Sequence, residues 1–214
     1  MVSEKVADIL LKTNAVKINV NEPFTYTSGL VSPIYTDNRV LIGYTEERKI
    51  IVEGFAHLVK ERGLQPEFLA GTATAGIPWA AFLAAEMDLP MVYVRNKPKG
   101  HGAGKQIEGY MPEGKNVLVV EDLISTGGSS LNSVNALRNE GKGVVHEVFA
   151  IFTYGFEKAE NAFREASVAA TTLTDINVLM EVGKANGTFT DDEVEKVKAF
   201  VSDPENWASK YNLE

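Results

Sequence analysis

Short apolar runs alternate with longer amphipathic stretches through the middle of the chain. Four of these runs predict β-strands, at 67–71, 91–95, 116–120 and 144–152. Two stretches between them repeat their apolar residues at helical spacing, 77–87 and 129–140. Strands that are buried on both faces and joined by helices are typical of parallel sheets. The pattern therefore predicts an α/β fold in which a central, mostly parallel sheet is flanked by helices.

Both ends of the chain carry a different pattern. Helices are predicted from Ser3 to Thr13 and from Thr45 to a stop at Gly63. Short extended runs lie between these helices, at 15–18, 24–26 and 33–38. A capping box at Thr190–Glu193 opens a further helix near the carboxyl end. We predict one compact domain made of three parts: an N-terminal hood segment (1–40), an α/β core (41–165) and a C-terminal helical segment (166–214).

Composition and charge narrow the class of protein. The net charge is −8, which argues against binding to nucleic acid or to an anionic membrane. The sequence has no cysteine, so disulfides and thiolate chemistry are excluded. No apolar run approaches the roughly 18 residues of a membrane span, and the N-terminus lacks the pattern of a signal peptide. We therefore expect a cytoplasmic protein.

One basic stretch stands out against this acidic background. Residues 89–107 contain no acidic residue but include Arg95, Lys97, Lys99 and Lys105. A small cationic region on an acidic protein favours a small anionic ligand over a polyanion. The segment 95–109 is also rich in glycine and lacks apolar periodicity, so we expect an exposed loop. Taken alone, it could equally be a solvated surface hairpin.

Two adjacent carboxylates and a glycine-rich turn follow the strand predicted at 116–120. Glu121 and Asp122 precede Ser125-Thr-Gly-Gly-Ser129, after which a helix begins. Converging N–H groups and a helix N-terminus suit a phosphate, whereas the acids suit sugar hydroxyls or a divalent cation. No lysine follows the glycines and no G-x-G-x-x-G is present, so neither a P-loop nor a dinucleotide site is indicated. The alternative is a capped turn with solvated acids.

This stretch resembles the motif by which type I phosphoribosyltransferases bind phosphoribosyl pyrophosphate (PRPP). The resemblance implies that the turn holds the 5-phosphate and that the acids face the ribose hydroxyls. It also implies a type I phosphoribosyltransferase-like fold with a small hood from the N-terminal segment. The residues assigned to PRPP in this stretch are Glu121, Asp122, Leu123, Ile124, Ser125, Thr126, Gly127, Gly128 and Ser129.

The segment 95–109 resembles the catalytic loop of orotate phosphoribosyltransferases. By this resemblance Arg95, Lys99 and His101 bind PRPP, and the loop reaches the neighbouring subunit's site in a homodimer. Cations and Mg²⁺ carried by PRPP would stabilise the pyrophosphate as it leaves. Lys99 is expected to be the main loop catalyst, with Asp122 as the second catalytic residue.

The stretch Phe24–Arg39 narrows the resemblance to the orotate enzymes. It resembles their F-T-x-x-S-G-x-x-S-P-x-Y-x-D-N-R segment, which implies that Ser28 and Gly29 bind orotate. The family resemblance also assigns the Ser125 side chain to orotate. A Ser-Gly turn can offer unpaired N–H groups to a carboxylate. Residues 71–78 also match that family, as a second loop near the pyrophosphate.

The chain departs from this family at three places. Some members carry a lysine where this chain has Ala75, and another basic residue where it has Asn96. They also carry an orotate-binding arginine after the last core strand, where this chain reads Thr153-Tyr-Gly-Phe156. The group that neutralises the orotate carboxylate is therefore not identified by the resemblance.

The resemblance implies that orotate and PRPP yield orotidine 5′-monophosphate and pyrophosphate, the ribosylation step of pyrimidine (UMP) synthesis. Two alternatives remain: a phosphoribosyltransferase for another base, and a regulator that binds PRPP without chemistry. The stretch containing Ser28 and Gly29 disfavours the first, and the acidic charge disfavours the second because such regulators carry basic DNA-binding extensions. The remaining candidates are interpreted as structural residues, namely His57, His146, Trp79 and Trp207.

Overall fold

The protein is built around one six-stranded sheet. The computed structural model describes residues 2–26, 29–98 and 105–212. Neighbouring strands in the sheet follow the order β10-β9-β8-β5-β6-β7, and only β7 runs antiparallel to its neighbour. The predicted α/β fold with a mostly parallel sheet is therefore confirmed. The strands are β5 (Phe68–Thr72), β6 (Met91–Val94), β7 (Ile107–Glu108), β8 (Asn116–Ile124), β9 (Val144–Thr153) and β10 (Ala169–Asp175).

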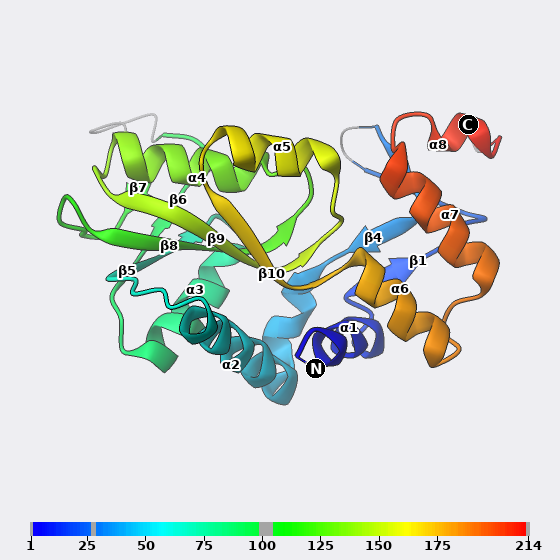
Figure 1. Ribbon diagram of the computed structural model, residues 1–214, viewed down its shortest axis with the longest axis horizontal. Coiled ribbons are helices and arrows are strands. Elements are labelled where there is room, and N and C mark those ends of the chain that lie inside the picture. The colour runs from blue at the N-terminus through cyan, green and yellow to red at the C-terminus, as the bar shows by residue number, and fades with distance from the viewer. Residues whose placement is uncertain (1, 27–28, 99–104, 213–214) are drawn as a thin grey trace.

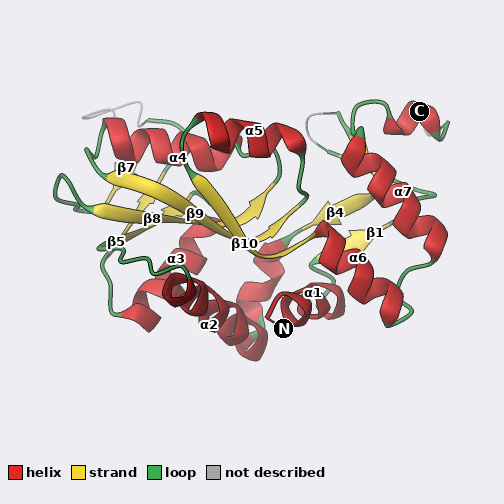
Figure 2. Cartoon of the chain, viewed as in Figure 1, coloured by secondary structure: helices red, strands yellow, loops and turns green. Residues whose placement is uncertain are grey.

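Helices cover both faces of the sheet (Figure 1). One layer contains α1 (Val2–Lys12), α2 (Thr45–Glu61) and α3 (Gly76–Met87). The opposite layer contains α4 (Gly128–Asn139) and α5 (Glu157–Glu165). Figure 2 shows the sheet lying between these layers, and each face of the sheet has its own buried apolar cluster.

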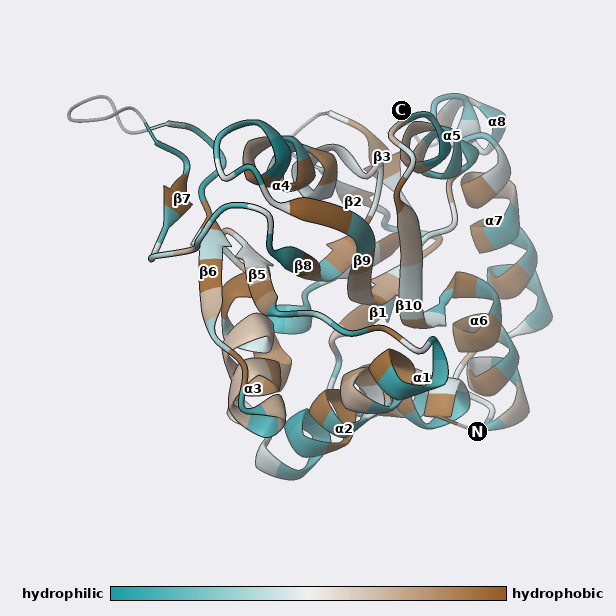
Figure 3. Ribbon diagram, turned by 60° about the vertical axis from the view of Figure 1, so that its left-hand side comes forward, coloured by the Kyte–Doolittle hydropathy of each residue, from teal (hydrophilic) through white to brown (hydrophobic). Residues whose placement is uncertain are grey.

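The two clusters follow from the alternation of side chains along each strand. In β8, Leu118 and Val120 pack on the side of α1 to α3, whereas Val117 and Val119 pack on the other side. All four side chains are buried. The apolar colouring of β8 and β9 in Figure 3 reflects strands buried on both faces.

The N-terminal and C-terminal segments lie together at one end of the sheet (Figure 1). Two small antiparallel pairs form there, β1 (Val16–Ile18) with β4 (Ile34–Thr36) and β2 (Phe24–Thr25) with β3 (Val31–Ser32). A 3₁₀ helix, η1 (Asn38–Gly43), leads from β4 into α2. The C-terminal helices are α6 (Ile176–Ala185), α7 (Asp191–Ser202) and α8 (Trp207–Lys210).

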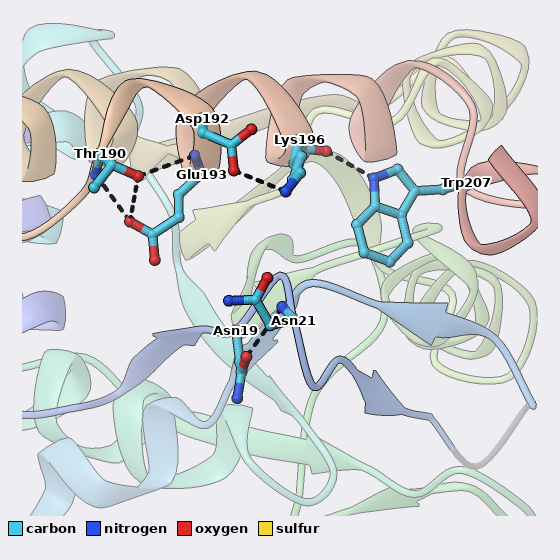
Figure 4. A network of polar contacts seen from close by, with 7 residues as sticks. All are labelled: Asn19, Asn21, Thr190, Asp192, Glu193, Lys196 and Trp207. Carbon is cyan, nitrogen blue, oxygen red and sulfur yellow. Dashed lines mark hydrogen bonds and ion pairs between the residues drawn. The ribbon is translucent and has the colours of Figure 1, made fainter. Parts of the chain in front are cut away.

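The capping box predicted at Thr190 is present at the start of α7. The Glu193 N–H donates to Thr190 Oγ1, and the Thr190 N–H donates to Glu193 Oε2 (Figure 4). In the middle of α7, the Lys196 carbonyl oxygen accepts the Trp207 indole N–H at 2.8 Å. This bond holds α8 against α7, and Trp207 is buried, so the interpretation of Trp207 as a packing residue is confirmed.

Two predicted elements differ from the structure. Strand β8 continues to Ile124, four residues beyond its predicted end at Val120, because β9 pairs with it along that length. Residues 169–175, expected in a helical segment, form the edge strand β10 instead. This strand has no continuous apolar run, since its solvent side carries alanine and threonine, so its hydrophobic pattern is weak. No helix in the described part of the chain is long and apolar enough to cross a membrane.

Candidate active site

A cleft opens where β8 outlasts its neighbour β5. The last pair between these strands joins Gly71 and Val120, whereas pairing with β9 continues to Ile124. Glu121 and Asp122 therefore sit beside a gap that the chain at 73–75 borders. The cleft has a volume of about 460 Å³. Its lining comprises 73–75, Asn96, 121–123, 125–129 and Asn132.

The acid pair is buried at the base of this cleft. Glu121 is 4% exposed, its Oε1 accepts the Asp122 N–H at 3.1 Å, and its Oε2 accepts the Ser129 hydroxyl at 3.4 Å. Burial raises the pKa of Glu121 well above its usual range, and the neighbouring Asp122 charge raises it further. Burial also raises the pKa of Asp122. The pair is thus short of positive charge and suits a ligand that brings hydroxyl donors or a cation.

A glycine lets α3 approach the acid pair closely. A Cβ atom on Gly76 would lie 2.5 Å from the Val120 carbonyl oxygen and 3.1 Å from the Glu121 Cα. No side chain fits at this separation, so the start of α3 can lie against β8 only with glycine at this position. The resemblance had placed 71–78 near the pyrophosphate, and the lining at 73–75 belongs to that stretch.

The turn after β8 leads directly into α4. Gly127 has a φ of +79°, in the left-handed region that favours glycine, and a Cβ there would lie 2.9 Å from the Phe163 ring. No side chain caps α4 at Gly127, so the first N–H groups of this 12-residue helix are left for a ligand. Together with the hydroxyls of 125–129, they offer the hydrogen-bond donors for which the sequence predicts phosphate binding.

The predicted residues of this turn do not all face the cleft. Leu123 and the five residues 125–129 line it. Ile124 does not, because its side chain is 2% exposed and packs against the α4–α5 layer. Its carbonyl oxygen accepts the Thr153 hydroxyl at 3.0 Å, which ties the turn to the end of β9.

Two side chains without a role predicted from the sequence hold the hood against this site, the buried Asn38 and the half-buried Tyr26. The Asn38 amide donates to the Asp122 carbonyl oxygen at 2.7 Å. The Tyr26 hydroxyl donates to the Ile34 carbonyl oxygen at 2.6 Å and lies 3.3 Å from the Tyr154 hydroxyl. Burial raises the pKa of the Tyr154 hydroxyl well above its usual range. Asn38 lay within the matched segment 24–39, but a motif alone does not show which side chains point inward.

The base of the loop at 95–109 is fixed by a backbone hydrogen bond across it and by the side-chain carboxylate of Glu140. Arg95 and Gln106 pair through the Arg95 N–H and the Gln106 carbonyl oxygen at 3.0 Å. Glu140, at the end of α4, accepts the N–H groups of Gln106 and Ile107 at 2.9 and 3.2 Å. Sequence reasoning missed Glu140, because no local pattern marks a helix-end acid as the acceptor of a distant backbone. Helix α4 therefore connects the turn at 125–129, at its start, to the base of the loop, at its end.

Of the predicted loop and hood residues, Arg95 and Gly29 lie in the described part of the chain. The Arg95 side chain pairs with Glu108 at 3.3 Å and does not line the cleft. Lys99, His101 and Ser28 lie outside the described residues. The Gly29 N–H donates to the Tyr26 carbonyl oxygen at 2.8 Å, so the expectation that this amide is unpaired is wrong.

A second cleft, of about 750 Å³, adjoins the first. Ser125 and Thr126 line both clefts. The second cleft is also lined by Tyr26 and Leu30 from the hood, by the start of α5, and by 201–205, which comprise the end of α7 and part of its connection to α8. Two adjoining clefts that share the turn at 125–129 can hold two substrates side by side.

Comparisons with known proteins identify the family. A model described as the phosphoribosyl transferase domain matches residues 44–173, which contain the acid pair and the turn. The orotate phosphoribosyltransferase of Streptococcus agalactiae is 47% identical over 207 residues, which are 97% of this chain and 99% of the relative. The chain belongs to the orotate phosphoribosyltransferases. The family that the motifs resembled is thereby confirmed.

Solved orotate phosphoribosyltransferases share the fold. The enzyme from Aeropyrum pernix is 29% identical and superposes with a TM-score of 0.73, covering 86% of this chain and 99% of its own. That from Mycobacterium tuberculosis, solved in complex with PRPP, has a TM-score of 0.65 at 20% identity and covers 84% of this chain and 99% of its own. The second likeness is one of fold alone.

Few side chains in the described part of this site could bind a metal ion. Within the described residues, no cluster of three or more acidic or histidine side chains could hold a metal. Glu121 and Asp122 are the carboxylates that line the first cleft. Burial raises the pKa of both carboxyls, and carboxylate oxygens are the ligands that Mg²⁺ prefers.

Proposed function

We propose that this chain transfers the ribose 5-phosphate of PRPP to orotate, giving orotidine 5′-monophosphate and pyrophosphate in pyrimidine synthesis. The observation that carries the proposal is the first cleft, where a buried acid pair and an uncapped helix N-terminus lie on either side of one turn. Ribose 5-phosphate has hydroxyls at one end and a phosphate at the other, which matches this arrangement.

The donor would lie along the carboxyl end of β8. Residues 125–129 and the first N–H groups of α4 would hold the 5-phosphate. Glu121 and Asp122 would accept hydrogen bonds from the ribose hydroxyls, and Asp122 is the acid that we assign to catalysis. The proposal is supported by the position of both acids within one cleft with the turn.

The leaving pyrophosphate would be stabilised by cations. As the orotate ring nitrogen, having lost its proton to solvent, bonds to C1, the bond from C1 to the pyrophosphate oxygen breaks and its electron pair leaves with the pyrophosphate. Lys99, His101 and Arg95 are the loop residues that we assign to this charge, with Lys99 as the main catalyst. Mg²⁺ bound to PRPP would supply further positive charge at the pyrophosphate. Arg95 would have to release Glu108 to take part.

Orotate would occupy the second cleft, next to C1 of the ribose. Ser125 is the side chain shared by both clefts that we assign to the base. Ser28 and Gly29 are assigned to the same substrate from the motif that contains them. Because the Gly29 N–H is engaged with Tyr26, Gly29 would act through its turn geometry, with a φ of +88°, rather than through its amide.

We further propose a cytoplasmic homodimer in which the loop 95–109 reaches the partner's cleft. Three apolar side chains of the hood and α2 region are exposed and would suit a subunit contact, namely Tyr35, Val40 and Tyr44. The division into hood, core and C-terminal segment remains part of this proposal. The net charge of −8 supports small-molecule substrates rather than nucleic acid or membrane.

The proposal is tested by the absorbance of orotate incubated with the purified protein, PRPP and Mg²⁺. Orotate consumption that requires PRPP and stops with EDTA is the expected result. If orotate is untouched, pyrophosphate release with uracil or hypoxanthine would show that the base is wrong. Release with none of the bases, together with PRPP binding, would contradict the enzymatic function altogether.

A further inference from the structure

The second cleft is formed by segments that are distant in sequence. Its walls come from the hood hairpin, the phosphate turn, the start of α5 and the α7–α8 connection. Figure 3 shows α5, α8 and β3 gathered at the same end of the molecule, and α8 contacts β3. A ligand in this cleft would therefore touch the core, the hood and the C-terminal segment at once.

An aromatic column fixes the wall between α5 and α7. The ring of Phe156 stacks on Tyr154 at 5.3 Å and meets the edge of Phe200 at 5.9 Å. Phe200 in turn meets Trp207 at 5.9 Å. Phe156 is 6% exposed, so this position serves packing and cannot present a charge to the cleft. The first turn of α5, which directly follows Phe156, is therefore held in place by the core.

Lys158, in the first turn of α5, is the basic residue of the cleft lining. Its side chain is exposed, and within the residues that the structure describes it forms no ion pair. The lining also contains Glu157, Asp203 and Glu205. Both carboxylate oxygens of Asp203 accept hydrogen bonds from the Asn206 amide, at 3.0 and 3.1 Å. An anionic ligand in this acidic surrounding has Lys158 as its favourable partner.

We propose that Lys158 binds the carboxylate of orotate and thereby selects orotate over bases that lack this group. The inference rests on the proposed function, which places the base in the second cleft beside Ser125. An orotate carboxylate that leaves water needs a charged partner, and discrimination is strong where a site is built for a polar group that the competitor lacks. The three acids of the lining increase this discrimination, because a carboxylate out of reach of Lys158 would be repelled.

The test compares Lys158→Ala, Lys158→Gln and Lys158→Arg with wild type. Lys49→Ala, on the exposed side of α2, is a matched control. We expect Lys158→Ala and Lys158→Gln to raise the KM for orotate by about 10- to 100-fold, the loss of one charged hydrogen bond. The KM for PRPP should change by less than about twofold, because the donor binds in the other cleft. Lys158→Arg should recover most of the orotate affinity.

A second readout separates recognition from general damage. The ratio of kcat/KM for orotate to that for uracil should fall in Lys158→Ala by the same factor as orotate affinity, since uracil has no carboxylate to lose. An unchanged orotate KM in Lys158→Ala, or an equal rise in both substrate KM values, would overturn the role of Lys158. Failure of the wild type to consume orotate would instead overturn the proposed function, and the role of Lys158 with it.

Discussion

The amide of Asn38 donates a hydrogen bond to the backbone carbonyl oxygen of Asp122 at 2.7 Å. Asn38 is fully buried, and it begins the 3₁₀ helix η1 that joins the hood to the core. The bond spans 84 residues of sequence. It fixes the end of β8 where that strand has no neighbour on the β5 side, so the hood supports the acid pair directly.

Replacing Asn38 should therefore disturb the donor site. Asn38→Ala leaves the Asp122 carbonyl oxygen unpaired, which should cost about 1 to 3 kcal/mol of unfolding free energy. The KM for PRPP should rise several-fold, because the Asp122 backbone loses its anchor. Chemical denaturation and steady-state kinetics measure the two effects, with Asn135→Ala, on the exposed side of α4, as the control. A folded Asn38→Ala protein with unchanged PRPP kinetics would contradict the role assigned to this bond.

Glu121→Gln should stabilise the protein while inactivating it. Burial raises the pKa of Glu121, so its contribution to stability is present at acid pH and is lost as the pH rises through that raised pKa. Removing the charge should raise stability at pH 8 by about 1 to 2 kcal/mol, or roughly 2 to 8 °C in Tm. The gain should shrink as the pH is lowered toward 4.5, the ordinary pKa of glutamate. Activity should fall on the order of 100-fold.

Differential scanning calorimetry at several pH values, with Glu165→Gln as an exposed control, tests this trade-off. A Glu121→Gln protein that is less stable than wild type at pH 8 would show that the carboxylate is compensated in the free protein. Full activity in that variant would show that Glu121 does not contact the donor.

A methyl group at Gly76 should push α3 away from the acid pair. Because the added Cβ would lie 2.5 Å from the Val120 carbonyl oxygen, Gly76→Ala should cost about 1 to 3 kcal/mol and weaken PRPP binding. Gly43→Ala is the matched control, since a Cβ there meets nothing within 4 Å. Thermal unfolding and PRPP titration measure the outcome. Equal stability of the two variants would mean that the approach of α3 to β8 is not tight.

Mixed dimers test whether the loop acts across the subunit interface. Lys99→Ala and Asp122→Asn proteins should each be nearly inactive, the first through its loop and the second through its cleft. If each loop serves the partner's cleft, refolding the two together should restore about a quarter of wild-type activity, since half of the dimers are mixed and each has one complete site. Size-exclusion chromatography verifies the dimers. Continued inactivity of a verified mixture would place the loop in its own subunit's site.

Much of the core could be predicted because its signals are local. The strand at 116–120, the acids that follow it and the turn at 125–129 are contiguous, so their chemistry is visible in the sequence. Strand ends were predicted less well, since the continuation of β8 to Ile124 depends on pairing with the distant β9. Strand β10 was missed because an edge strand needs no apolar run on its solvent side.

The parts of the site that were missed depend on contacts between distant segments. Asn38 and Asp122 meet only after the hood folds onto the core, and Glu140 accepts N–H groups of a loop more than 30 residues away. Lys158 acquires its place because the aromatic column positions α5 beside the C-terminal helices. Residue type alone does not mark such groups, since lysine and asparagine are both mostly exposed and most of them have no such role.

The most direct test of the account is product formation from orotate and PRPP. Purified protein with Mg²⁺ should form orotidine 5′-monophosphate and pyrophosphate in equal amounts. Mass spectrometry identifies the nucleotide, and a pyrophosphate-release assay measures the second product. The double variant Glu121→Gln/Asp122→Asn should remain folded and form neither product. Absence of orotidine 5′-monophosphate with the wild type, or undiminished formation by the double variant, would contradict the claim that the cleft at the end of β8 is the phosphoribosyl transfer site.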